Sequence, residues 1–115
     1  MSRLEKIQAM LADDPSDTFL RYSLAMEYRG NGQMDQALAI FDELMVEDPP
    51  HVQAHFMAAQ ILVDQSRIEA ARTHLRRGID HARAQDNAHA AAEMSELLSS
   101  LGALGESADG DDDEL

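Results

Sequence analysis

The sequence lacks several residue types that would point to particular functions. Its 115 residues include no cysteine and no tryptophan, and aromatic residues make up only 4%. Without cysteine the chain has no disulfide scaffold, no thiolate zinc site and no cysteine nucleophile. No run of about 18 apolar residues occurs, so the sequence predicts no membrane-spanning helix. Apolar residues still make up 44% of the chain, which is enough for a core of leucine, isoleucine, alanine and methionine.

Positive charge is also scarce. Lys6 is the only lysine, and nine basic residues stand against 22 acidic ones, which gives a net charge of −13. Free nucleic acid and anionic membrane surfaces repel such a chain, so we expect neither as a partner. The first ten residues have no apolar core of the signal-peptide type, which favours a cytoplasmic protein.

The acidic residues are concentrated at one end. Residues 106–115 hold six of the 22, and the remaining 16 acids against nine bases leave the body at −7. This end has no apolar periodicity that could offset the entropy cost of ordering it. We therefore expect a folded domain over residues 1–101 and an acidic, disordered tail over residues 102–115.

Apolar residues along the body recur with the period of an α-helix. Clear stripes cover residues 3–11, 34–45, 67–83 and 87–101. Two further helices are bounded by stop signals, one between Pro15 and Gly30 and one between Pro50 and Asp64. Ser66 and Glu69 have the spacing of a capping box at the start of the fifth helix. No segment alternates with period two, so we expect an all-α fold of about six helices, with short connections between antiparallel neighbours.

The helices repeat with a fixed period. Pro15 and Pro49 each follow an acidic residue at the end of a helix, and they lie 34 residues apart. The pairs Ala37/Ala71 and Phe41/Leu75 have the same separation. This period, with a helix–turn–helix inside it, resembles the tetratricopeptide repeat (TPR). The resemblance is best in residues 18–51 and rests on Leu24, Ala25, Tyr28, Gly32, Ala37, Phe41 and Pro49.

The remaining segments fit the same repeat less closely. Residues 52–85 match with Ser66 in place of the turn glycine, and the absence of a closing proline suggests a fifth helix that runs to about Ala84. Residues 1–17 resemble the second helix of a preceding half-repeat, and residues 86–101 the first helix of a following one. Arg21 departs from the family, which usually has a tryptophan or another large residue there.

The resemblance implies a TPR-like α-solenoid with no catalytic site and no cofactor. Its first helices would line a concave groove that holds a peptide or helix of a partner protein. Phe19, Tyr22 and Met26 share a face of the second helix, at i, i+3 and i+7, apart from its main packing stripe. The simpler alternative is that this face packs on a neighbouring helix of the same chain. The predicted groove consists of Phe19, Tyr22, Met26, Phe56, Gln60, Val63 and Met94.

The composition of this groove favours one kind of partner. Members of the family that clamp a C-terminal carboxylate use lysines and asparagines, and no lysine lies on the predicted surface here. An apolar or basic protein segment is therefore the expected ligand. The alternative function is structural, with the apolar faces buried in a homodimer.

Other clusters have simpler explanations. His51 and His55 have an i, i+4 spacing that can chelate a metal, but no known ligand framework surrounds them, so we expect no metal site. We expect His51 at the start of a helix and His55 in a packing position. Arg72, Arg76 and Arg83 form a basic stripe that could hold an anion or the acidic tail, although pairing with Glu69 and Asp80 on the same helix accounts for it. The sequence has no glycine-rich phosphate loop, no HExxH and no nucleophile elbow, so it does not predict an enzyme.

Overall fold

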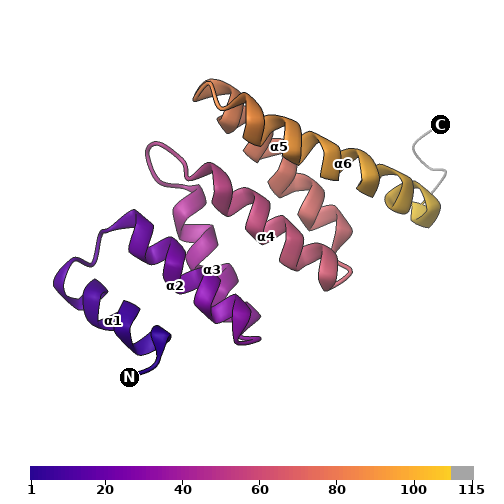
Figure 1. The fold of residues 1–115 in the computed structure, drawn as a ribbon. Coiled ribbons are helices and arrows are strands. Elements are labelled where there is room, and N and C mark those ends of the chain that lie inside the picture. The colour runs from indigo at the N-terminus through magenta and orange to yellow at the C-terminus, as the bar shows by residue number, and fades with distance from the viewer. Residues whose placement is uncertain (110–115) are drawn as a thin grey trace. The chain divides into compact units, whose positions relative to one another are not determined.

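The computed structural model describes the backbone of residues 1–109 and the side chains of residues 1–102. This part of the chain is α-helical without strands, which confirms the all-α helix–turn–helix prediction (Figure 1). The helices are α1 (Arg3–Asp13), α2 (Thr18–Gly30), α3 (Met34–Met45), α4 (Val52–Asp64), α5 (Ile68–Ala84) and α6 (Ala88–Asp109). They fall into two compact units, Met1–Ala54 and His55–Leu115.

The last helix is longer than the sequence predicts. We expected it to end at residue 101, but α6 continues to Asp109. The alanine and serine residues beyond Gly102 are compatible with a helix. The predicted tail over residues 102–115 therefore begins inside a helix. Its disorder stays a prediction for residues 110–115, which lie outside the described part of the chain.

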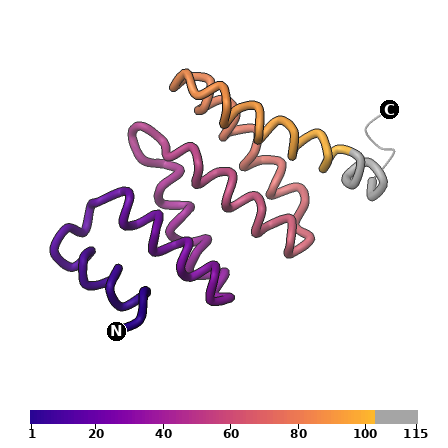
Figure 2. Tube along the Cα trace, in the orientation of Figure 1, coloured from indigo at the N-terminus to yellow at the C-terminus, as the bar shows by residue number. Residues whose placement is uncertain are grey.

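Figure 2 traces the Cα path of the chain through its helices and connections. Three of the connections have the same local structure. Gly32, Ser66 and Asp86 adopt left-handed backbone conformations, with φ of 80°, 62° and 59°. In each turn this residue donates its N–H to the carbonyl three residues back, at 2.9–3.1 Å, and the next residue donates to the carbonyl five back, at 2.8 Å. This pair of bonds is the Schellman motif that closes helix C-termini.

The helix starts rely on side-chain caps at several positions. Ser2 and Glu5 form a reciprocal capping box on α1, and Asp17 accepts from the Leu20 N–H at 2.9 Å on α2. The capping box predicted for Ser66 and Glu69 is wrong. Arg67 holds the N-cap position of α5 without a side-chain cap, because Ser66 is in the left-handed conformation that ends α4, whereas an N-cap needs an extended one.

The core of the first unit forms around Phe41. Its side chain is fully buried, as are Ala25 of α2 and Ala37 of α3. The small side chains of the two alanines let α2 and α3 approach closely, and Phe41 fills the remaining space against Tyr22, with ring centroids 5.8 Å apart. Ile7 adds the buried contact of α1. The predicted core position of Phe41 is confirmed.

The core of the second unit depends on a glycine. Leu75, Met94 and Leu101 are buried, which confirms the core position predicted for Leu75. Gly78 of α5 faces Met94 and His55 so closely that an added Cβ would lie 2.6 Å from the Met94 sulfur and 2.7 Å from the His55 Cβ. The absence of a side chain at Gly78 is what allows α5 to pack against α4 and α6 at this point.

Candidate functional site

In the first unit, the three residues of the predicted groove have different surroundings. Phe19 is 74% exposed and lines an open cleft between α1 and α2, of about 430 Å³. Tyr22 is half-buried and packs on Phe41, while Met26 is half-buried and does not line this cleft. The simpler alternative, packing within the chain, therefore applies to Tyr22 but not to Phe19.

Tyr22 also holds His51, the residue immediately before α4. Its ring stacks on the His51 imidazole, with centroids 5.0 Å apart and planes 18° from parallel. The His51 Nδ1 accepts a hydrogen bond from the Ala54 N–H at 3.2 Å, so the neutral imidazole caps the helix. Burial lowers the pKa of His51, with Arg21 adding to that effect and Glu47 opposing it. His51 thus lies at a helix start, as the sequence predicted, and the hydrogen bond that it accepts from the Ala54 N–H gives it the role of a cap.

This cap predicts a pH-dependent stability. Because the pKa of His51 is lower in the folded chain than its unfolded value of about 6.5, the unfolded state binds a proton first as pH falls. The stability that His51 contributes is complete above that value and is lost as pH falls through the lower folded pKa. In urea titrations at pH 7.5 and 5.5, wild type should lose more stability than His51→Asn, because asparagine caps helices but does not titrate. An equal loss in both proteins would contradict this role.

Arg21, the departure from the repeat pattern, links α2 to the end of α3. Its side chain is only 17% exposed and forms ion pairs with Glu47 and, at 3.3 Å, with Glu43. The guanidinium donates hydrogen bonds to both carboxylates. Arg21 therefore occupies the place of the family's large residue with a long side chain of its own.

In the second unit, two residues of the predicted groove line one cleft. Phe56 and Gln60 of α4 face α6 across an opening of about 370 Å³. We call this opening the α4/α6 cleft, and its lining is Phe56, Gln60, Glu93, Glu96, Leu97 and Ser100. The two glutamates were not part of the predicted groove. They lie at i and i+3 on α6, with Glu93 one turn before Leu97 and Glu96 next to it.

The other two predicted residues of this unit do not line the cleft. Val63 is half-buried, and Met94 is only 1% exposed. The assignment of Met94 to an open groove is corrected here, because the missing side chain of Gly78 leaves space that the Met94 thioether fills. Met94 is therefore a core residue of the second unit.

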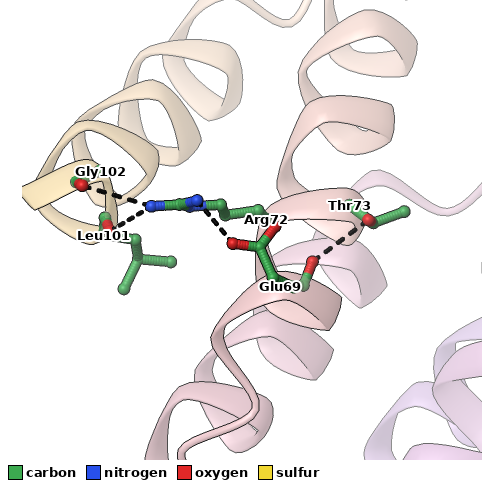
Figure 3. Close-up of polar contacts among 5 residues, drawn as sticks. All are labelled: Glu69, Arg72, Thr73, Leu101 and Gly102. Carbon is green, nitrogen blue, oxygen red and sulfur yellow. Dashed lines mark hydrogen bonds and ion pairs between the residues drawn. The ribbon is translucent and has the colours of Figure 1, made fainter. Parts of the chain in front are cut away.

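The basic stripe of α5 does not act as a single site. Arg72 pairs with Glu69 at 2.7 Å, as expected, and also donates to the backbone carbonyls of Leu101, at 2.8 Å, and Gly102, at 3.3 Å (Figure 3). Its guanidinium thus ties α5 to α6 and is not available to an anion. Arg76 and Arg83 are exposed, and within residues 1–102 neither forms the expected pair with Asp80.

The two histidines with chelating spacing have structural roles: His51 caps α4, and His55 is a packing residue, as expected. His55 is 2% exposed and lies against the ring of His81, with centroids 5.2 Å apart. In the part of the chain whose residues are described, no group of three or more His, Asp or Glu side chains is arranged to hold a metal ion. Within the same part, no helix is both long and apolar enough to cross a membrane.

The helix–turn–helix fold of this chain agrees with that of a known family of proteins. Residues 2–78, about two thirds of the chain, match the family described as anaphase-promoting complex, cyclosome, subunit 3, which is of the TPR type. The chain belongs to this family. The predicted resemblance to a small TPR protein is thereby confirmed, and the fold of this TPR protein is that of a protein–protein interaction module.

Solved structures support the same assignment. A tetratricopeptide repeat domain protein from Salinibacter ruber is 28% identical, with a TM-score of 0.74 over 78% of this chain and 91% of that one. A protein from Bordetella parapertussis is 24% identical, with a TM-score of 0.78 over 92% of each chain, and shows the likeness of fold alone. No curated protein sequence matches this TPR protein significantly.

Proposed function

We propose that this TPR protein is a non-catalytic interaction module that binds an apolar and basic segment of a partner protein in the α4/α6 cleft. The observation that carries this proposal is the meeting of Phe56, Gln60 and Leu97, from two first helices of successive repeats, around one opening. Its volume of about 370 Å³ is within the range of ligand-binding clefts, roughly 300–1,000 Å³.

The lining of the cleft suits a segment with apolar and basic side chains. Phe56 and Leu97 are half-buried, so each keeps part of its apolar surface open to a ligand. Glu96 is exposed at the rim, and Glu93 lies 3.5 Å from the exposed His89, which carries charge only when protonated. A lysine or arginine of the partner can lay its apolar stem on Phe56 while its head reaches a carboxylate.

The charge of the whole chain acts in the same direction. With a net charge of −13, the protein attracts a basic partner over a distance that the ionic strength limits to roughly 10 Å at 0.1 M salt. Such attraction mainly accelerates encounter, while the apolar contacts in the cleft hold the complex. The affinity should therefore fall with added salt but not vanish.

Binding of a matched pair of peptides tests the proposal. We expect a fluorescent peptide of leucines and lysines to bind the full chain, and the same peptide with glutamate in place of lysine to bind at least tenfold more weakly. Glu96→Lys should reduce the affinity for the lysine peptide roughly tenfold, about 1.4 kcal/mol. Fluorescence anisotropy at low and moderate salt gives both affinities.

The control places the same charge change outside the cleft. Asp80→Lys alters an exposed residue of α5 and should leave the affinity within about twofold, since screening weakens its effect at a distance. Equal losses in Glu96→Lys and Asp80→Lys would refute the cleft as the binding site. The homodimer predicted as the alternative stays a prediction, and sedimentation velocity over a concentration series tests it.

A further inference from the structure

The first unit has a second cleft with the opposite charge at its rim. This α1/α2 cleft, of about 430 Å³, is lined by Arg3, Lys6, Ile7, Met10, Phe19, Leu20 and Ser23. It shares no residue with the α4/α6 cleft. The predicted groove included only Phe19 from this set.

The walls of the α1/α2 cleft expose unusually large apolar side chains. Phe19 of α2 is 74% exposed and Met10 of α1 is 48% exposed, while Ile7 is buried beneath them. Single exposed apolar residues are common, but here a ring and a flexible thioether face one cleft from two different helices. The two side chains therefore offer apolar surface on both sides of the cleft, so a ligand between them would contact both.

The rim of this cleft is basic in a protein that is otherwise strongly acidic. Arg3 and Lys6 lie at i and i+3, so they occupy neighbouring positions on α1. Arg3 pairs with Glu27 at 3.2 Å, yet its side chain stays 78% exposed. Lys6 is exposed and has no salt-bridge partner within residues 1–102. The cleft thus presents at least one unneutralised positive charge beside apolar walls.

The position of α1 in the repeat indicates what shape of ligand fits. In residues 18–45 the second helix of the repeat, α3, packs on the first helix, α2. Residues 1–17 correspond to a second helix, so α1 has the kind of face that packs on a first helix in this repeat. The exposed face of α1, together with Phe19 of α2, therefore has the form on which a helix packs in this fold.

We propose that the α1/α2 cleft binds an amphipathic helix of a partner protein, with an apolar stripe flanked by acidic residues. The apolar stripe packs against Met10 and Phe19, and the acidic flank lies against Lys6 and Arg3. A second copy of this chain is a poorer occupant, because the basic rims of the two paired clefts would oppose each other. The interaction rests on the TPR fold but not on the ligand of the α4/α6 cleft.

Two designed peptides test this proposal on the full chain. The acidic probe has leucines at i, i+3, i+4 and i+7 and glutamates and alanines elsewhere, and the basic probe has lysines in place of the glutamates. We expect Lys6→Glu to weaken binding of the acidic probe at least tenfold, and Phe19→Ala to weaken it at least fivefold, by fluorescence anisotropy. Neither variant should change binding of the basic probe to the α4/α6 cleft more than twofold.

Matched variants and a truncation give results that would overturn the proposal. Arg76→Glu, on the exposed face of α5, and Val46→Ala, at a site 83% exposed, should leave the affinity for the acidic probe unchanged. Equal losses in these controls, or no binding of the acidic probe, would refute the proposal while leaving the α4/α6 cleft untouched. If deletion of residues 106–115 made the acidic probe bind more tightly, the occupant of the cleft would be the chain's own acidic segment. If the protein formed a dimer that the probe dissociates, the occupant would be a second copy of the chain.

Discussion

Replacing Phe41 with alanine is expected to lower the free energy of unfolding by about 3–5 kcal/mol. The phenyl ring is fully buried and lies against Tyr22, and the alanines at positions 25 and 37 are too small to fill the space left by its loss. The deletion therefore removes apolar burial and leaves a cavity. Because small domains have only about 5–15 kcal/mol of stability, the midpoint of a urea denaturation curve should fall sharply.

A size series at the same position separates the cavity from other effects. Phe41→Leu keeps most of the apolar volume and should lose clearly less stability than Phe41→Ala. Circular dichroism should show that both variants are helical without denaturant. A loss below about 1 kcal/mol for Phe41→Ala would mean that Phe41 is not the centre of the first unit's core.

Gly78→Ala is expected to destabilise the second unit by about 1–3 kcal/mol, although alanine is the better helix former. The new methyl group would lie 2.6 Å from the Met94 sulfur and 2.7 Å from the His55 Cβ. The thioether can move, but the Cβ of His55 is attached directly to the backbone of α4. Relief of the overlap therefore requires α4 and α5 to separate slightly, which loosens the surrounding core.

The same substitution at an open site is the matched control. An added Cβ at Gly102 of α6 would meet nothing within 4 Å, so Gly102→Ala should be neutral or stabilising by up to about 1 kcal/mol. Opposite signs for the two variants in thermal denaturation would confirm that contact, and not helix propensity, decides the effect at Gly78. If Gly78→Ala raised the melting temperature as Gly102→Ala does, the close packing of α5 would be disproved.

The sequence predicted the helices well because the two signals that it offers, the apolar stripe and the stop residues, are both local. The apolar stripe and the stop residues determined five of the six helices to within two residues at the ends that the sequence specified, and only the end of α6 differed. Local signals are less informative where one residue could either end one helix or cap the start of the next. Ser66 suits an N-cap by type, but the hydrogen bonds that close α4 place it in the left-handed conformation instead.

The candidate site was harder to predict because it depends on contacts between helices. Met94 was assigned to the groove from its helix face alone, whereas its burial follows from a glycine 16 positions earlier in the chain. The basic rim of the α1/α2 cleft was overlooked, although Arg3, Lys6 and Met10 have the i, i+3, i+7 spacing of one face of α1. A comparison of the faces of consecutive helices, and not of each helix alone, would have found it.

The three Schellman turns also bear on how divergent repeats can be recognised. Only one of them has glycine in the left-handed position, and the others have serine and aspartate. A non-glycine residue costs roughly 1–2 kcal/mol in this conformation, which the two hydrogen bonds of each turn and the packing of the adjoining helices offset. A repeat search that requires the turn glycine would therefore overlook the turn at Ser66, and one that requires the closing proline would overlook the junction at Asp86. Small side chains at the helix crossings, such as Ala25, Ala37, Ala71 and Gly78, are the better markers of this fold in chains whose repeats have diverged.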